Sequence, residues 1–308
     1  MDEIQNRVTR CVGVEVTNSS LNAVCLDDSG SISATHSVEV DFRERSSTQV
    51  AAFIETLKGI FGQFDLVGVA VPGLVSRDAK SVAFSAHIPE HSGLDLAAEI
   101  AAATGVRAYV ENDANAAAYG EYILGAGRGS HNIFYATLGT GVGGAFIFEG
   151  EIWRGAAGFA GEFGYVPINS EGMRLEEVAS SANIIRRTRS RFHQDNTSSL
   201  VDIDENLMTI SDIVTAAIAE DDFAKLMLER TGNYVGTAVA SVINLLNIER
   251  IIVGGEIMRA GSIVLDSIIA RARELSFSPS FASTVIAAGE LGSNASAAGA
   301  ALLAARAS

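Results

Sequence analysis

The chain has 308 residues, with 22 basic and 37 acidic side chains and a formal net charge of −15. This excess of acid argues against a nucleic-acid surface, because neutralising phosphates requires clustered Lys and Arg. Hydrophobic residues make up 48% of the chain and charged residues 19%, which is typical of a folded protein rather than a disordered one. At this length we expect roughly two domains, each large enough to bury its own core.

The sequence contains no segment typical of a membrane span or a secretion signal. No run of about 20 apolar residues occurs, and the N-terminus MDEIQNRVTR lacks the basic-then-apolar order of a signal peptide. The two cysteines, Cys11 and Cys25, form no CxxC pair, which excludes a cysteine-based zinc site. We therefore expect a cytoplasmic protein that binds no membrane.

The first half of the chain alternates short apolar segments with amphipathic ones. Strands are predicted at 11–17, 21–26, 32–40, 66–71 and 107–110. Helices are predicted at 49–61, 94–103 and 114–122. Pro72-Gly73 ends the fourth of these strands.

The pattern then restarts in the second half. Strands are predicted at 132–138, 145–148, from 151 onward and at 250–253, with a glycine turn at 139–144. Helices are predicted at 176–189, 210–218 and 223–246. Because each half opens with three consecutive strands, the sequence predicts a duplicated α/β unit with a cleft between the two copies.

The segment LGTGVGG, Leu138 to Gly144, lies between two predicted strands. Its four glycines allow several backbone N–H groups to point towards one place, which is how a turn holds a phosphate without lysine. The alternative is a hairpin turn whose glycines serve only to adopt positive φ. On spacing alone both interpretations stay open.

A second motif, Glu111-Asn112-Asp113-Ala114-Asn115, lies where a predicted strand meets a predicted helix. A carboxylate at the end of a strand is placed to take a proton from a hydroxyl, and Asn112 can both donate to and accept from a polyol. The alternative is that Asn112 or Asp113 only caps the helix.

A third motif, GAAGFAGEFGY at 155–165, surrounds Glu162 with glycines. Nothing beside this glutamate covers an apolar surface, so packing does not explain it. Its carboxylate suits hydrogen bonding to vicinal hydroxyls.

Seven segments, in this order, resemble the ROK family (repressors, open reading frames and kinases) of the sugar kinase and actin-like ATPase superfamily. They are VGVAVPGLV around 68–75, ENDANAAAYGE (111–121), LGTGVGG (138–144), GAAGFAGEFGY (155–165), LEEVAS (175–180), LNIERIIVGGEI (246–257) and SNASAAGAALLA (293–304). The resemblance covers nearly the whole chain.

The resemblance implies an α/β fold of two ribonuclease-H-like domains with a cleft between them. We expect an N-terminal domain at 1–125 and a C-terminal domain at 126–292, with the last helix, about 293–308, packing back on the first domain. Dimers are usual in this family, so a homodimer is expected.

The resemblance also implies roles for single residues in an ATP- and Mg²⁺-dependent hexokinase. Asp113 would be the general base for the sugar 6-hydroxyl. The sugar would be bound by Gly73, Asn112, Glu162 and Glu176. The nucleotide would be bound by Gly139, Thr140 and Gly141 at its phosphates and by Gly254 and Gly255 at its adenosine.

The first hairpin departs from the family's pattern. Family kinases carry a DxGGT turn here, whereas the aligned stretch runs from Glu15 to Ser19 as EVTNS. Glu15 keeps a charge that can address Mg²⁺, and Ser19 can donate a hydrogen bond to ATP. Thr17 and Asn18, however, bring β-carbons to the place where phosphate approaches, and a β-branched residue adopts left-handed backbone poorly. We expect a weakened phosphate loop.

Two other departures concern the sugar. The family's zinc motif, a His followed by CxCGxxGC, is missing: Tyr165 replaces the His, and 167–174 contains no cysteine, so we expect no structural zinc. Where the family often has Asn before LPGW, this chain has His87 before Ile-Pro-Glu-His. His87 is a candidate substrate contact, with a solvated loop histidine as the alternative.

Two functions are therefore weighed. The first is ATP-dependent phosphorylation of a hexose, glucose or a close relative, at the 6-hydroxyl, with polyphosphate as the other possible donor. The second is a ROK-type sugar-sensing protein that keeps the sugar site but has lost phosphoryl transfer. Family repressors carry an additional N-terminal DNA-binding segment. Because the first strand is predicted from residue 11, we expect no such segment here and no nucleic-acid partner.

Overall fold

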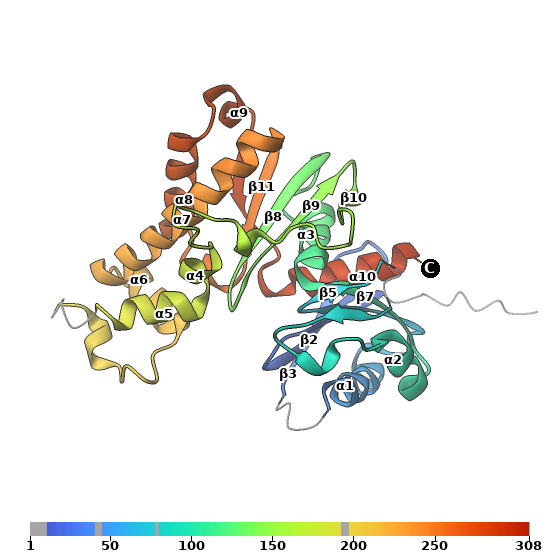
Figure 1. Ribbon diagram of the computed structural model, residues 1–308. Coiled ribbons are helices and arrows are strands. Elements are labelled where there is room, and N and C mark those ends of the chain that lie inside the picture. The colour runs from blue at the N-terminus through green and yellow to red at the C-terminus, as the bar shows by residue number, and fades with distance from the viewer. Residues whose placement is uncertain (1–10, 41–44, 78–79, 192–196, 308) are drawn as a thin grey trace, which may run out of the picture. The chain divides into compact units, whose positions relative to one another are not determined.

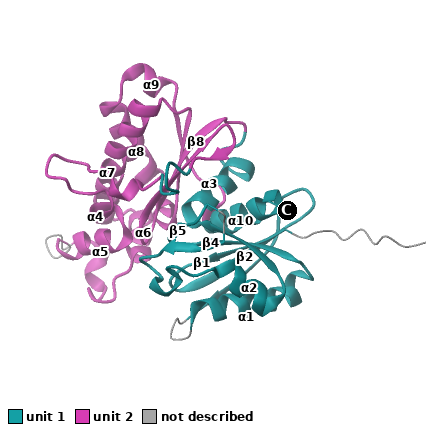
Figure 2. Ribbon diagram, turned by 45° about the vertical axis from the view of Figure 1, so that its right-hand side comes forward, with its two compact units in different colours: residues 1–128, 154–160, 293–308 teal, residues 129–153, 161–292 magenta. Residues whose placement is uncertain are grey.

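The structure, a computed structural model, describes residues 11–40, 45–77, 80–191 and 197–307 (Figure 1). The chain forms two compact units, shown in different colours in Figure 2. Unit 1 extends to Arg128 and also includes Arg154–Ala160 and the chain from Ser293 onward. Unit 2 comprises Gly129–Trp153 and Gly161–Gly292. The chain therefore passes from one unit to the other four times.

Unit 1 is built on a five-stranded mixed sheet. Its order is β3 (Ile32–Glu39), β2 (Ser20–Leu26), β1 (Cys11–Val16), β4 (Leu66–Val71) and β7 (Arg107–Asn112). The first three strands are antiparallel neighbours, whereas β1, β4 and β7 run parallel. Consequently the carboxyl ends of β1, β4 and β7 meet at one edge of the sheet. A separate hairpin pairs β5 (Leu74–Val75) with β6 (Val82–Phe84).

Helices cover both faces of this sheet. They are α1 (Ser46–Phe61) and α2 (Leu96–Thr104), which contact each other, and α3 (Asp113–Leu124) and α10 (Ala295–Ala307), which contact each other (Figure 1). The core between the sheet and the first pair includes Val14, Val69, Ile54, Leu57 and Ile100, all fully buried. This burial follows the apolar face of α1, where Val50, Ile54 and Leu57 recur at helical spacing.

The C-terminal helix α10 lies directly on the first sheet, which is possible because both surfaces carry small residues. A β-carbon on Gly13 would overlap the backbone of Ala297, and one on Gly68 would overlap the carbonyl of Ala300. The alanine-rich sequence of α10 thus reflects close packing of its backbone against β1 and β4.

Unit 2 repeats the same sheet order. Its strands are β10 (Glu151–Ile152), β9 (Val142–Phe148), β8 (Asn132–Leu138), β11 (Arg250–Gly254) and β12 (Val285–Ala288). Its helices are α4 (Glu176–Ala179), α5 (Ser181–Arg189), α6 (Ile210–Ile218), α7 (Asp222–Leu246), α8 (Ser262–Leu275) and α9 (Ser278–Ala282). Each unit therefore contains the predicted three-strand meander, and in each the sheet continues with parallel strands.

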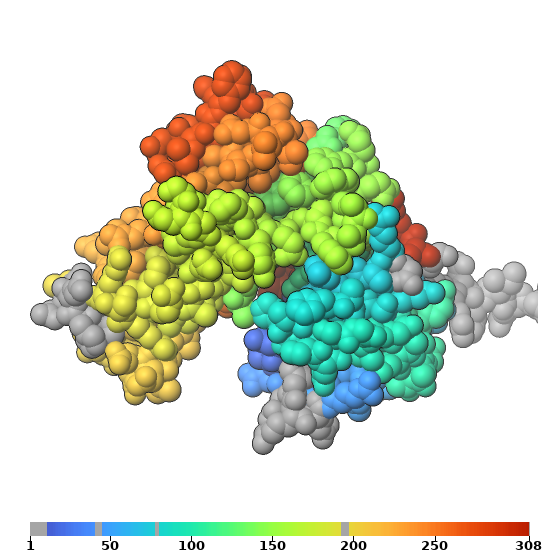
Figure 3. All heavy atoms as spheres, in the orientation of Figure 1, coloured from blue at the N-terminus to red at the C-terminus, as the bar shows by residue number. Residues whose placement is uncertain are grey.

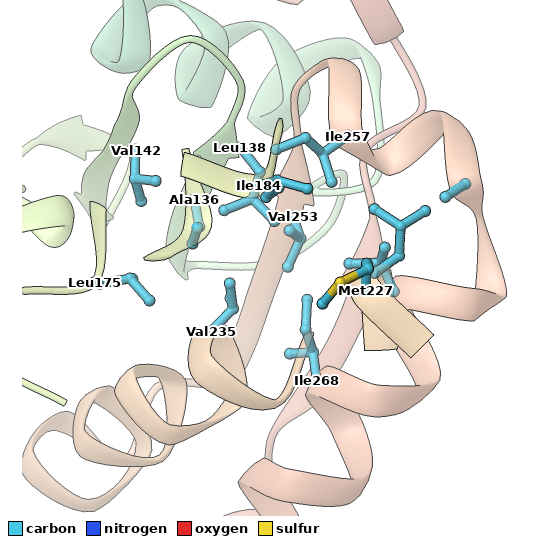
Figure 4. Close-up of a cluster of buried hydrophobic side chains, with 14 of the residues drawn as sticks. Ala136, Leu138, Val142, Leu175, Ile184, Met227, Val235, Val253, Ile257 and Ile268 are labelled. Carbon is cyan, nitrogen blue, oxygen red and sulfur yellow. The ribbon is translucent and has the colours of Figure 1, made fainter. Parts of the chain in front are cut away.

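The core of unit 2 lies between its sheet and the helices α7 and α8. Figure 4 shows this cluster, in which Leu138 and Val253 from the sheet face Val235 and Ile268 from α7 and α8. All four side chains are fully buried. This core holds the end of β8, which precedes the glycine turn, and the end of β11, whose last residue is Gly254.

Several predicted elements differ from the observed ones. The helix expected at 176–189 is divided at Ser180, whose backbone is extended, into α4 and α5. Glu111 and Asn112 still belong to β7, which was expected to end at residue 110. The helices α8 and α9 and the strand β12 were not predicted, although Val264, Ile268 and Ala272 of α8 form a buried stripe. Among the described residues, no helix is both long and apolar enough to cross a membrane.

Candidate active site

The strand end at Asn112 is fixed by hydrogen bonds that use most of the Asn112 side chain. Its oxygen accepts from the backbone N–H of Asn115 at 3.0 Å, so Asn112 is the N-cap of α3, as the capping alternative stated. Its amide nitrogen donates to the carbonyl of Gly73 and to Oδ1 of Asp113, both at 2.9 Å. Because both amide hydrogens are used, Asn112 retains only acceptor capacity for a ligand.

Asp113 begins α3, and its carboxylate also accepts a hydrogen bond from its own backbone N–H. Its Oδ1 accepts from Asn112 and, at 2.9 Å, from the backbone N–H of Ala114; neither bond uses Oδ2. Burial, together with the negative charge of Glu15, raises the pKa of Asp113 to about 7. A carboxylate that titrates near neutrality is suited to accept a proton from a hydroxyl.

Glu15 comes close to this motif because of the sheet register. Glu15 on β1 pairs with Ala70 on β4, and Ala70 pairs with Glu111 on β7. The Glu15 carboxylate accepts from Nδ2 of Asn22 at 3.1 Å and is also hydrogen-bonded to Ser296. Burial raises the pKa of Glu15.

The turn after Glu15 is closed by its own side chain. Oγ1 of Thr17 accepts from the backbone N–H groups of Ser19 at 3.2 Å and Ser20 at 2.9 Å, and it donates to the Ser20 carbonyl at 3.0 Å. Neither Thr17 nor Asn18 has positive φ, so the left-handed strain considered above does not arise. The N–H of Ser19, a predicted phosphate donor, is already hydrogen-bonded within the loop.

Gly73 lies directly beside the Asn112–Asp113 pair. Its φ is +137°, and a β-carbon would lie 2.5 Å from the carbonyl oxygen of Phe84, so this position requires glycine. Next to it, the buried Ser85 donates to the carbonyl of Pro72 at 2.6 Å. The structure thus brings together the predicted residues Gly73, Asn112, Asp113 and Glu15 in unit 1.

Glu111 is a buried acid of this motif, and its sequence pattern predicts no role for it. Its Oε1 accepts from the backbone N–H of Asn112 at 2.9 Å and from the side chain of Asn115 at 3.1 Å. Its Oε2 forms an ion pair with Arg154. Arg154 was not predicted as a site residue, and the only available signal was that a buried acid requires a partner.

In unit 2 the glycine turn between β8 and β9 is shorter than predicted. Gly143 and Gly144 are paired strand residues, so the turn consists of Gly139, Thr140 and Gly141. The turn is closed by a hydrogen bond from Gly139 N–H to the Gly141 carbonyl at 3.0 Å. The segment joins the two strands of a hairpin, but none of these glycines has positive φ, so the conformational reason given for them in the hairpin alternative is wrong.

Gly255 lies against this glycine turn. Its φ is +94°, and a β-carbon there would overlap the backbone of Leu138. Ser181 at the start of α5 connects the glycine turn with the residue after Gly255. Its N–H donates to the Gly139 carbonyl at 2.8 Å, and its hydroxyl donates to Glu256 at 2.7 Å. The predicted nucleotide residues Gly139 and Gly255 are therefore neighbours. Ser181 and Glu256 were not predicted.

Glu162 and Glu176 also lie near each other in unit 2. Burial and the negative charge of Glu176 raise the pKa of Glu162. The Glu176 carboxylate accepts from the N–H of Val142 at 2.9 Å, which ties this predicted sugar ligand to the glycine turn.

Tyr165 and His87 are less closely tied to these groups. Tyr165, which replaces the family histidine, is 58% exposed and its ring lies under the guanidinium of Arg174. The stretch around residues 150–175 lies at the surface on the face that Figure 3 shows. His87 is exposed, and within the described part of the chain no hydrogen bond or ion pair holds it.

Two of these side chains carry the donor type that Mg²⁺ prefers. Carboxylate oxygens are the ligands that Mg²⁺ prefers, and it commonly takes one or two of them beside substrate phosphates. Glu15 and Asp113 fit that donor type. Among the described residues no cluster of three or more His, Cys, Asp or Glu side chains is placed to hold a metal ion. A metal here would therefore depend on phosphate oxygens as further ligands.

Comparison with known proteins identifies the relatives of this chain. A glucokinase of Halalkalibacterium halodurans is 31% identical over 275 residues, which cover 83% of each chain. The xylose repressor of Bacillus subtilis is 26% identical over 277 residues, covering 83% of this chain and 66% of the repressor.

Solved structures confirm the predicted fold class. A ROK family glucokinase from Streptomyces griseus, in complex with glucose and AMPPNP, superposes with a TM-score of 0.85 and 27% identity, covering 96% of this chain and 99% of that one. The two five-stranded mixed sheets are those of the actin-like ATPase fold of ROK sugar kinases. The ROK family profile matches residues 11–307. The chain belongs to the ROK family.

Proposed function

We propose that this protein is a hexokinase that transfers the γ-phosphoryl group of ATP to the 6-hydroxyl of a hexose, glucose or a close relative. The observation that carries the proposal is Asp113: a carboxylate at a strand end, oriented by Asn112 and Ala114, with a pKa raised to about 7. This combination is what a general base for a hydroxyl requires. The related glucokinase that binds glucose and AMPPNP supports the choice of substrates.

In the proposed reaction Oδ2 of Asp113 accepts the proton of the sugar 6-hydroxyl while the hydroxyl oxygen bonds to the γ-phosphorus of ATP. The bond from phosphorus to the bridging oxygen breaks, ADP leaves, and the proton passes to solvent. Glu15 would contact the Mg²⁺ that is bound with the nucleotide, and this ion would neutralise phosphate charge. Such transfers depend on positioning and charge stabilisation rather than on covalent catalysis.

The remaining residues would hold the two substrates. We assign hexose hydroxyls to Glu162, Glu176 and the acceptor oxygen of Asn112, with Gly73 and His87 as further contacts. For the nucleotide we assign the phosphates to Gly139–Gly141 and Ser19, and the adenosine to Gly254 and Gly255. A cytoplasmic homodimer without structural zinc stays a prediction.

The proposal is tested by ADP release across a panel of hexoses at millimolar concentration. We expect turnover with at least one sugar and loss of turnover in Asp113→Asn with sugar binding retained. Asp65→Asn, an exposed aspartate of the same unit, is the matched control and should keep wild-type turnover. No turnover with any sugar would refute the kinase, and full activity in Asp113→Asn would refute the base assignment.

One observation favours the second candidate, a sugar-sensing protein without transferase activity. In the first hairpin the N–H groups of Ser19 and Ser20 donate to Thr17. The Glu15 carboxylate accepts from Asn22. The hairpin and Glu15 therefore have hydrogen-bond partners without a nucleotide. Calorimetry separates the candidates. The sensor requires hexose binding without ATP binding, whereas the kinase requires ATP binding that depends on Mg²⁺.

A further inference from the structure

Arg154 contacts two residues of the strand that presents Asp113. It forms an ion pair with Glu111 and a hydrogen bond with Tyr109, which lies two positions earlier on β7. The Glu111 side chain is 3% exposed and that of Arg154 is 27% exposed. Removal of the arginine would therefore leave a carboxylate buried without its cation, which is costly.

Arg154 is also the first residue of a short loop, 154–160, whose two ends are hydrogen-bonded to each other. The N–H of Ala160 donates to the carbonyl of Arg154 at 3.2 Å. A second arginine, Arg77, donates to the carbonyls of Gly155 at 2.7 Å and Ala156 at 3.1 Å. Two arginine contacts thus hold the loop 154–160 in unit 1, although the segments before and after it belong to unit 2.

The ion pair is connected to the proposed base through backbone and side-chain hydrogen bonds. The oxygen of Glu111 that is not paired with Arg154 accepts from the N–H of Asn112 and from the side chain of Asn115. Asn112 in turn caps α3 and donates to Asp113. A change in the position of Glu111 therefore alters the residue that orients Asp113.

We propose that Arg154 is a positioning residue for hexose phosphorylation: its ion pair with Glu111 anchors the loop 154–160 to the end of β7 and holds Asn112 and Asp113 in their orientation. This inference rests on the proposed function. The chain leaves the loop at Gly161 and reaches Glu162, a proposed sugar ligand, at the next residue. Arg154 itself touches neither substrate.

Loss of the ion pair would release one of the two oxygens of Glu111. The other oxygen would still accept from the N–H of Asn112 and the side chain of Asn115. Because the buried carboxylate would then lack its cation, we expect Glu111 to shift and to displace Asn112, the residue before Asp113.

The test uses Arg154→Met, Arg154→Lys and the double variant Arg154→Met with Glu111→Gln in the full chain. We expect Arg154→Met to lower kcat/KM for the hexose by about 10- to 100-fold, because the reacting groups would be misplaced. Lys should restore most of the loss, because only one guanidinium nitrogen contacts Glu111. The double variant should lose little more kcat/KM than Arg154→Met alone, because the two residues act as one pair. Arg107→Met, an exposed arginine at the start of β7, is the matched control.

A second readout does not depend on turnover. Trp153 is the only tryptophan and directly precedes Arg154, so its fluorescence reports on this loop during hexose titration. We expect weaker hexose binding in Arg154→Met and wild-type binding in Arg107→Met. If the wild type binds a hexose but turns over none, the proposed function fails while the binding comparison still judges Arg154.

The inference is overturned by an unchanged kcat/KM and hexose affinity in Arg154→Met. It is also overturned if activity and melting temperature fall together and Lys does not restore the activity, because that result assigns Arg154 a purely structural role. If the wild type binds no hexose at all, the inference and the proposed function fail together.

Discussion

Asn112 donates one amide hydrogen to the Asp113 carboxylate at 2.9 Å while its oxygen caps α3. One side chain therefore begins the helix and orients the proposed base. Its second amide hydrogen goes to Gly73, so rotation of the side chain would break three hydrogen bonds. The helix cap and the proposed orientation of the base depend on different atoms of the same amide, so substitutions can separate the two.

Asn112→Ser should retain the cap but lose the donor to Asp113, whereas Asn112→Ala should lose both. We expect Asn112→Ala to lower the free energy of unfolding by about 1 kcal/mol, the usual effect of a lost cap, and Asn112→Ser by only a few tenths. Both should lower kcat by about tenfold or more. Urea unfolding and steady-state kinetics measure the two effects. Equal kcat in Asn112→Ser and wild type would refute the positioning role.

The activity of the proposed kinase should depend on pH through Asp113. Because the pKa of this base is raised to about 7, kcat/KM should fall below neutral pH as the base becomes protonated. The charge of Glu15 contributes to the increase, so Glu15→Gln should lower the pKa and move the acid limb to lower pH. Any contact of Glu15 with Mg²⁺ would instead change the rate at high pH, where kcat/KM no longer depends on pH. Glu39→Gln, an exposed acid on β3, should leave the limb in place.

Gly59 and Gly68 form a matched pair for the packing of α10. A β-carbon on Gly68 would overlap the backbone carbonyl of Ala300, so Gly68→Ala must displace α10 and should destabilise unit 1 by about 1–3 kcal/mol. Gly59 lies in α1 with open space around it, so Gly59→Ala should stabilise by about 0.5–1 kcal/mol through helix propensity. Chemical denaturation of both variants checks the contrast. Equal effects in both would mean that α10 does not pack this closely.

His91 should make stability depend on pH. It is fully buried, its Nε2 is 2.9 Å from the Ser46 hydroxyl, and its Nδ1 has no hydrogen-bond partner among the described residues. Burial lowers the pKa of His91 below its usual value near 6.5. The unfolded chain therefore binds the proton more readily, and the contribution of His91 is complete above pH 6.5 and is lost as pH falls below that value.

The measurement is urea unfolding at pH 7.5 and pH 5.5 for wild type, His91→Gln and the exposed control His131→Gln. The wild type and the control should lose stability between these pH values by more than His91→Gln does. An identical loss in all three proteins would show that His91 does not titrate in this range.

The sequence by itself determined many of the local elements and the family. Alternating apolar residues and the glycines or prolines that end them depend only on neighbours along the chain. For this reason strands such as β4 and β8 and the helix α6 were predicted at their observed residues. The motifs around Asp113 and Glu162 likewise show their residue types at fixed spacing without any knowledge of the fold.

The tertiary structure decided how those residues are used. Glu111 and Arg154 are 43 positions apart, and Val142 and Glu176 are 34 apart, so no local pattern links either pair. The closeness of Glu15 to the Asp113 strand end follows from the pairing of β1, β4 and β7. Amphipathic and turn patterns reflect the conformation of single segments, whereas burial, charge pairing and pKa depend on which segments meet. Only the packed fold therefore raises the pKa of Asp113 and gives Arg154 its partner.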